Sequence, residues 1–252
     1  MTAHRLFPLL SVSALLSACT VSATPFAYDV PAQDVAGLAA QIERGDLTLR
    51  GQETDQISIQ GESWGRARDE EKAAERQAGN AWTVTLPETS TAPLYISAES
   101  DRSSAGVDFD IVSPSALPAE IEVEDGGVYL VDLRGAFEID ASRVELDGVG
   151  GMLDIQAGTG GVAGVLDLQE GDEVMIVVHG GAVDLQLPYG PDYDISVWSH
   201  PEANVDVDVS GLWVEQAHDG YYTGRGLFGT VRITILSDSG DVTVRDAFSW
   251  LD

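Results

Sequence analysis

Apolar and polar residues alternate along most of this chain, and the alternation restricts the fold more than any other feature. Residues 107–111 and 205–209 alternate strictly. A period of two places one face of a strand in a core and the other in water. The same pattern recurs at residues 46–50, 56–60, 83–86, 121–123, 232–235 and 241–245. The sequence therefore predicts an all-β fold.

Glycine pairs punctuate the alternating segments at regular places. They occur at residues 126–127, 150–151, 160–161 and 180–181, and Gly-Asp precedes strands at residues 45–46, 171–172 and 240–241. Glycine adopts positive φ without steric cost, so these pairs predict sharp corners between short strands. Such an arrangement is typical of a sandwich, a barrel or a solenoid.

A weak repeat discriminates among these architectures. A glycine corner is followed by a strand in which Asp precedes an aliphatic residue, at residues 150–155, 164–168 and 180–185, with a variant at 127–133. Repeats of this kind suit the stacked coils of a solenoid. We predict one β-solenoid domain over residues 29–248. A β-sandwich is the alternative, although its common two-residue Asn-Gly loop does not occur.

One charged segment interrupts the alternation. Residues 65–79 are rich in helix formers and lack an apolar face. We predict a short charged loop or helix there, between two strands.

Composition excludes several classes of protein. Hydrophobic residues make up 44% of the 252, which is enough for a real core, and a single cysteine allows no internal disulfide. The formal net charge is -29. Such a surface repels polyanions and anionic headgroups, so we expect no nucleic-acid partner.

The first 18 residues have the parts of an export signal. Arg5 gives the start a positive charge, and the apolar run 6–16 is too short to span a bilayer at ~1.5 Å per residue. Cleavage after it would leave the mature chain at -30, because one arginine and no acid are removed. One alternative is an ordinary secretory signal, in which the cysteine at residue 19 occurs by chance.

The sequence Leu16-Ser17-Ala18-Cys19 resembles the bacterial lipobox. The resemblance implies a lipoprotein in which the Cys19 thiol carries diacylglycerol and the new amine carries a further acyl chain such as palmitate. Several acyl chains give stable membrane anchoring where one chain does not. Residues 19–28 would form a tether, and Thr20, in place of an aspartate, favours the outer membrane by the same resemblance.

The strand pattern also resembles a known family. Residues 44–51 and 56–61, the charged insert after them, and the closing run 239–244 are similar to the "putative adhesin" family of β-solenoid envelope proteins. The likeness covers about residues 29–245. It implies a repetitive β fold at the cell envelope and carries no catalytic residue to this chain.

No motif of a known enzyme class is present. The histidines at 4, 179, 200 and 218 lie in no zinc-binding pattern, and neither a nucleophile elbow nor a phosphate loop occurs. Carboxylates are so numerous that a glycosidase pair can be neither nominated nor dismissed. We expect no enzyme and no cofactor.

Calcium is the one ion that the sequence suggests. If Asp154, Asp167 and Asp184 occupied equivalent places on successive coils, they would stack about 4.8 Å apart. Like charges across a ladder are destabilising, and calcium accepts oxygen ligands, so we hypothesise a weak calcium-binding stripe.

Aromatic residues gather late in the chain. Tyr221 and Tyr222 lie in a glycine-rich run, 219–229, which we expect to be a mobile loop and a ligand-binding candidate. The alternative is that the late aromatic side chains cap the open end of the solenoid.

Together these features predict a lipid-anchored protein of the cell envelope whose adhesin-like domain acts by surface contact. Its partners would be the membrane, through the anchor, and a protein or a glycan. One alternative is a carbohydrate-binding module or carbohydrate-active enzyme. A second is a structural envelope protein with no ligand.

Overall fold

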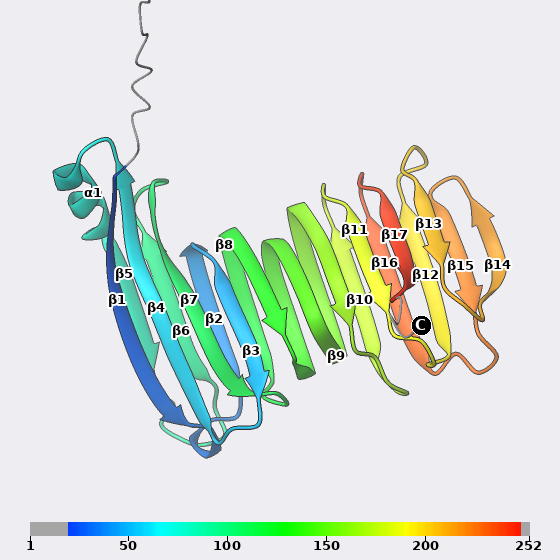
Figure 1. The fold of residues 1–252 in the computed structure, drawn as a ribbon, viewed down its shortest axis with the longest axis horizontal. Coiled ribbons are helices and arrows are strands. Elements are labelled where there is room, and N and C mark those ends of the chain that lie inside the picture. The colour runs from blue at the N-terminus through cyan, green and yellow to red at the C-terminus, as the bar shows by residue number, and fades with distance from the viewer. Residues whose placement is uncertain (1–19, 248–252) are drawn as a thin grey trace, which may run out of the picture.

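The computed structural model describes residues 20–247. Over these residues the protein is all-β apart from one short α-helix and one 3-10 turn, and its strands form one large sheet that does not close (Figure 1). The all-β prediction is confirmed. The elements are β1 (Thr20–Pro31), η1 (Ala32–Asp34), β2 (Leu38–Arg44), β3 (Leu47–Gln52), β4 (Gln56–Ala67), α1 (Glu70–Gln77), β5 (Asn80–Thr85), β6 (Leu94–Ser100), β7 (Ala105–Pro114), β8 (Ala119–Val131), β9 (Arg134–Leu166), β10 (Glu173–Val178), β11 (Val183–Leu187), β12 (Tyr193–Ser199), β13 (Val205–Asp208), β14 (Trp213–His218), β15 (Tyr221–Arg225), β16 (Val231–Ser237) and β17 (Val242–Asp246).

The strands run in two series of neighbours, which we call the first and second layers. The first layer runs β5, β6, β2, the start of β8, then β9, β10, β16, β12, β15 and β14. The second runs β1, β4, β7, β3, the end of β8, then β9, β11, β17 and β13. The chain passes between the layers at the glycine-rich corners.

Parallel pairing keeps like residues in register along each layer. Ile121 pairs with Ile139, and Ile155 with Ile176, and all four side chains are buried. Inward-facing aliphatic side chains of both layers form one core. Burying such a side chain stabilises the folded state by about 1.5–3 kcal/mol. The alternation seen in the sequence therefore favours this fold, because it places an apolar residue at every inward position.

Strands near both ends of the chain, although not the edge strand β1, are inserted into the stack. The strand β16 lies between β10 and β12, and β17 lies between β11 and β13. Near the other end, β2 lies between β6 and β8 and β3 between β7 and β8. Each inserted strand is therefore hydrogen-bonded on both edges.

The tether prediction for residues 19–28 is wrong from Thr20 onward. Those residues belong to β1, which pairs antiparallel with β4 along its whole length. Phe26 stacks on Trp82 of β5, with ring centroids 3.8 Å apart. It fits because Gly61 opposite has no side chain: a Cβ there would lie 2.1 Å from the Phe26 ring. These two rings close the core at this end, so the β domain starts before residue 29.

The charged segment at 65–79 contains the helix α1. Asp69 caps its N-terminus by accepting a hydrogen bond from the backbone N–H of Lys72. That hydrogen bond lowers the pKa of the Asp69 carboxyl. Ala73 is the buried residue of the helix, and it lies against Gly65 of β4, where a Cβ would meet the Ala73 carbonyl oxygen at 2.4 Å.

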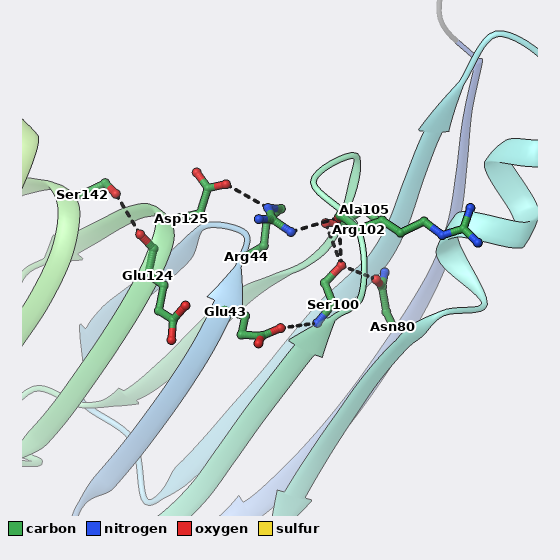
Figure 2. A network of polar contacts seen from close by, with 9 residues as sticks. All are labelled: Glu43, Arg44, Asn80, Ser100, Arg102, Ala105, Glu124, Asp125 and Ser142. Atoms are coloured by element: carbon green, nitrogen blue, oxygen red, sulfur yellow. Dashed lines mark hydrogen bonds and ion pairs between the residues drawn. The ribbon is translucent and has the colours of Figure 1, made fainter.

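Polar side chains fasten the same end of the first layer (Figure 2). Arg44 bonds the carboxylate of Asp125 at 2.8 Å and the backbone carbonyl of Arg102 at 2.9 Å. Arg102 in turn pairs with Glu75 of α1 at 3.1 Å. The turn between β6 and β7 is thereby tied to both the sheet and the helix.

Within residues 20–247 no helix has the length and apolar character needed to cross a membrane. The export signal and Cys19 lie outside the described residues.

Candidate binding surface

A row of aromatic rings lies on the solvent side of the first layer, at the end farthest from β1. Trp198 of β12 pairs with Tyr221 of β15, and Tyr221 pairs with His218 of β14. The Trp198 and Tyr221 ring centroids are 5.8 Å apart, and those of His218 and Tyr221 are 4.9 Å apart and stacked. Trp198 is 42% exposed. The three rings form one accessible ladder across three strands.

The row continues inward along the same layer. Val177 of β10 pairs with Leu236 of β16, which pairs with Trp198, and both aliphatic side chains are half-buried. An outward row of a half-solvated strand is usually polar. Five successive apolar or aromatic positions at one outward register therefore stand out as a candidate contact surface.

A second outward row, separated from the first by the row that contains Thr234 and Ser196, is charged and internally paired. Arg232 bonds Glu173 at 3.1 Å, and Arg225 bonds Asp194 at 3.0 Å. The hydrogen bond and charge of Asp194 raise the pKa of the Arg225 guanidinium. Trp213, 74% exposed, ends this row beside Arg225. We call Trp198, Trp213, His218 and Tyr221 the distal aromatic surface.

The turn after β15 adds apolar area close to this surface. Leu227 and Phe228 are largely exposed. The carboxylate of Asp192 accepts the backbone N–H of Phe228, and so fixes the turn against the start of β12. Large exposed apolar side chains gathered at one place are typical of interaction sites.

The two predicted tyrosines have opposite environments. Tyr221 is partly exposed and belongs to the distal aromatic surface. Tyr222 is a correction, because it points inward, is 6% exposed and packs in the core. Burial raises the pKa of its phenol. The mobile-loop prediction for 219–229 is also wrong over β15, because that strand pairs on both sides, with β12 and β14.

The late aromatic residues do not act together as a cap. Tyr193 is buried in β12, which lies between β16 and β15, and its hydroxyl donates to the Pro188 carbonyl at 2.6 Å. Tyr189 is 79% exposed and caps nothing. Phe248 and Trp250 lie outside the described residues. His218 was not predicted as part of a binding surface, because residues 213–218 do not alternate and carry no strand signal.

The three aspartates of the calcium hypothesis are not stacked. Asp154 lies in the first layer opposite Met175, and Asp184 lies in the second layer opposite Ala163 and Thr243. Asp167 lies just past the end of β9, near Arg134. The repeat misled because the copy at 150–155 lies in the first layer, whereas the copies at 164–168 and 180–185 lie in the second layer and are out of register with each other. Within residues 20–247 no group of three or more Asp, Glu, His or Cys side chains could hold a metal ion.

Carboxylates do stack elsewhere on the first layer. Glu120 pairs with Glu138, and Glu122 with Asp140, on neighbouring strands of β8 and β9. None of these four carboxylates forms an ion pair with a described basic residue; Gln41 donates to Glu122 at 3.3 Å. The alternating sequence of residues 120–123 and 138–141 carries this signal.

A groove of about 660 Å³ lies on the second layer and is lined in part by carboxylates. Three of the four acidic residues that line it form hydrogen bonds or an ion pair within the protein. Asp108 accepts the backbone N–H of Asp46, Asp46 accepts that of Gly127, and Asp110 pairs with Arg50. These contacts fasten neighbouring strands to one another and leave Glu62 as the lining acid without such a bond.

Comparison with known proteins shows the fold alone. A putative cell adhesion protein from Clostridium sporogenes superimposes with a TM-score of 0.52 and 14% identity, over 90% of this chain and all of that one. A putative adhesin from Bacteroides fragilis aligns over 89% of this chain and 97% of its own, with 10% identity and a TM-score of 0.28. No family model and no curated protein matches the sequence. This chain therefore shares its overall fold with the Clostridium protein.

Proposed function

We propose that this chain is a lipid-anchored envelope protein whose adhesin-like, non-catalytic β domain binds by surface contact at the distal aromatic surface. The observation that carries the proposal is the placement of this surface. It lies at the end of the sheet opposite β1, which begins directly after Cys19 (Figure 1). A protein held to a membrane at Cys19 would present these rings on its outer end.

The domain is proposed to be a single β-solenoid. The continuous β9 contributes to both layers and pairs in parallel with β8 before it and with β10 and β11 after it. A strand that winds through successive turns produces this pattern, whereas hairpins of a sandwich pair antiparallel. The antiparallel pairs lie at the two ends, in β1, β4 and β7, in β5 with β6, and in β12, β15 and β14.

The anchor at the outer membrane is supported by sequence and by position. The lipobox ends at Cys19, and Thr20 is already paired with Ala67. No slack separates the proposed lipid from the folded body. Substituting Cys19→Ser should move the protein from the membrane fraction to the soluble fraction; retention on the membrane would refute the anchor.

Removing two rings tests the binding surface. Trp198→Ala with Tyr221→Ala deletes most of the aromatic row, while Tyr95→Ala, an exposed ring on the same layer near the opposite end, is the matched control. Bacteria that produce the double variant should adhere to surfaces at least about tenfold less, since each central aromatic contact is worth roughly 1–2 kcal/mol. Equal adhesion at equal amounts of membrane-bound protein would refute the proposal.

A carbohydrate-binding function is the second candidate, and the two exposed tryptophans favour it. Trp198 is 42% exposed and Trp213 is 74% exposed, so each offers apolar ring surface on which a sugar ring can stack. A panel of immobilised glycans distinguishes the candidates. Binding that the double variant loses supports a carbohydrate ligand; lost adhesion without any glycan binding supports a protein partner. A structural protein with no ligand would show neither.

A further inference from the structure

Unpaired arginines gather at one corner of this strongly acidic protein. Within residues 20–247, nine of the twelve basic side chains have a carboxylate within 4.0 Å. The three that have none are Arg66, Arg68 and Arg76. Arg66 lies at the end of β4, Arg76 lies in α1, and Arg68 lies in the short connection between these two elements. Arg76 also donates a hydrogen bond to the backbone carbonyl of Arg66.

This corner is also where the chain enters the domain. Thr20 pairs with Ala67, and Val21 pairs with Arg66, so the first residues of β1 lie beside these arginines. Helix α1 lies against the same part of β1, where Ser22 donates to Gln77 at 2.8 Å (Figure 1). Consecutive Cα atoms are about 3.8 Å apart, so Cys19 joins the domain within this corner.

Apolar side chains accompany the arginines. Val21 is 53% exposed on the same outward face as Arg66. The Arg66 guanidinium lies over the Trp64 ring, 4.6 Å from its centroid. Tryptophan, arginine and exposed aliphatic side chains are the usual combination at a membrane–water interface.

Charge distinguishes this corner from the rest of the body. Residues 66–77 contain four basic and four acidic side chains and are therefore neutral, within a chain of net charge -29. Two of those acids are engaged, Asp69 with Lys72 and Glu75 with Arg102. Two nearby arginines are paired, Arg44 with Asp125 (Figure 2) and Arg102 with Glu75. Elsewhere the body would be repelled by anionic lipid.

We infer that this corner, formed by Val21, Trp64, Arg66, Arg68 and Arg76, docks on the anionic lipid headgroups of the membrane that holds the anchor. The inference rests on the proposed lipid at Cys19. The acyl chains supply the attachment, and the corner sets the orientation of the body. With the corner on the headgroups, the sheet stands away from the membrane and the distal aromatic surface points outward.

Two fluorescent positions test the orientation in the full-length lipidated protein. One label is placed by Ala74→Cys on the exposed side of α1, and the control label by Gln216→Cys on β14. Vesicles of phosphatidylcholine, with or without phosphatidylglycerol, contain a lipid-borne quencher. We expect the Ala74 position to be quenched more on phosphatidylglycerol vesicles, and the Gln216 position to stay unquenched on both.

Matched charge variants isolate the corner. Arg66→Gln with Arg68→Gln removes two unpaired cations, and Arg232→Gln with Arg245→Gln removes two cations from β16 and β17. A basic residue near an anionic surface changes partitioning about fivefold, so the first pair should lower the ratio of docked to undocked bodies by roughly 25-fold. The second pair should not lower it. Molar salt should have the same effect as the first pair, because the Debye length falls to about 3 Å.

The outcomes separate this inference from the anchor. A protein that does not float with vesicles refutes the anchor and, with it, the docking. A protein that floats but shows equal quenching at Ala74 on both kinds of vesicle refutes the docking alone. Quenching at Gln216 equal to that at Ala74 also refutes it, because the body would then lie flat.

Discussion

The close contact between neighbouring strand segments at Gly164 gives the sharpest test of how the sheet is held together. Gly164 has φ +146°, and a Cβ there would lie 1.9 Å from the carbonyl oxygen of Leu146. Gly171 has φ +92° and open space around its Cβ position. The two alanine substitutions therefore share the cost of positive φ but differ in the collision.

The expected magnitudes follow from that difference. Positive φ in alanine costs of order 1–3 kcal/mol at either site. At Gly164 the neighbouring backbone must also move by more than 1 Å to reach an ordinary contact distance of 3.4 Å. Overpacking adds about 1–3 kcal/mol, and a strained ladder hydrogen bond about 1 kcal/mol more. Gly164→Ala should thus be about 2–4 kcal/mol less stable than Gly171→Ala.

Urea unfolding followed by circular dichroism measures this difference. With a slope near 3 kcal/mol per molar urea, the midpoint of Gly164→Ala should lie about 1 M below that of Gly171→Ala. Coincident midpoints with equal slopes would refute the reasoning, because they would mean that the strands separate at no cost.

Further predictions concern the charged rows, the helix cap, the buried tyrosines and the closed end. Glu122→Gln should raise the free energy of unfolding in low salt by about 0.2–1 kcal/mol, because it removes one of two facing carboxylates. The gain, measured by urea unfolding, should be smaller in high salt. The pKa of Asp69 is lowered by its cap, so its contribution to stability is present above its ordinary pKa of 3.8 and lost as pH falls through the folded value. The protection of the α1 amides against hydrogen exchange, relative to their intrinsic rates at each pH, should therefore fall in acid, and it should fall less in Asp69→Asn, which keeps the cap. Burial, aided by the charge of Asp246, raises the pKa of Tyr193, so ultraviolet titration should show Tyr193 ionising after the exposed tyrosines, with stability lost as pH rises above about 10. Phe26→Ala should cost about 3–5 kcal/mol in urea unfolding, because it opens the core beneath Trp82.

The local structure of the strands was readable from the sequence. Leu47 and Leu49 alternate with polar neighbours, and both are buried as predicted. The reason is that burial of every second side chain is the same physical requirement in any sheet. The helix within 65–79 was also foreseen, because its residues favour a helix and its cap follows a standard pattern.

Pairings between distant segments were not readable. No local signal states that β16 lies between β10 and β12, since strand order depends on contacts some 59 residues apart, such as Glu173 with Arg232. The strand β1 was missed although Phe26, Tyr28 and Val30 alternate, because small residues before them resembled a tether. Tyr222 was misplaced because neighbouring residues of a strand face opposite sides, and only the register decides which one is buried.

Because strands stack side by side along the sheet, the length of the molecule in that direction is set by the number of strands in each layer. Neighbouring strands lie about 4.8 Å apart, so the first layer places the distal rings on the order of 40 Å from β5. Insertion or loss of one strand in each layer in the middle, where β8 and β9 pair in parallel, would change that distance by one strand spacing and leave both ends of the sheet unchanged. Evolution could thus adjust the reach of the protein without redesigning either the corner at Thr20 or the rings at Trp198.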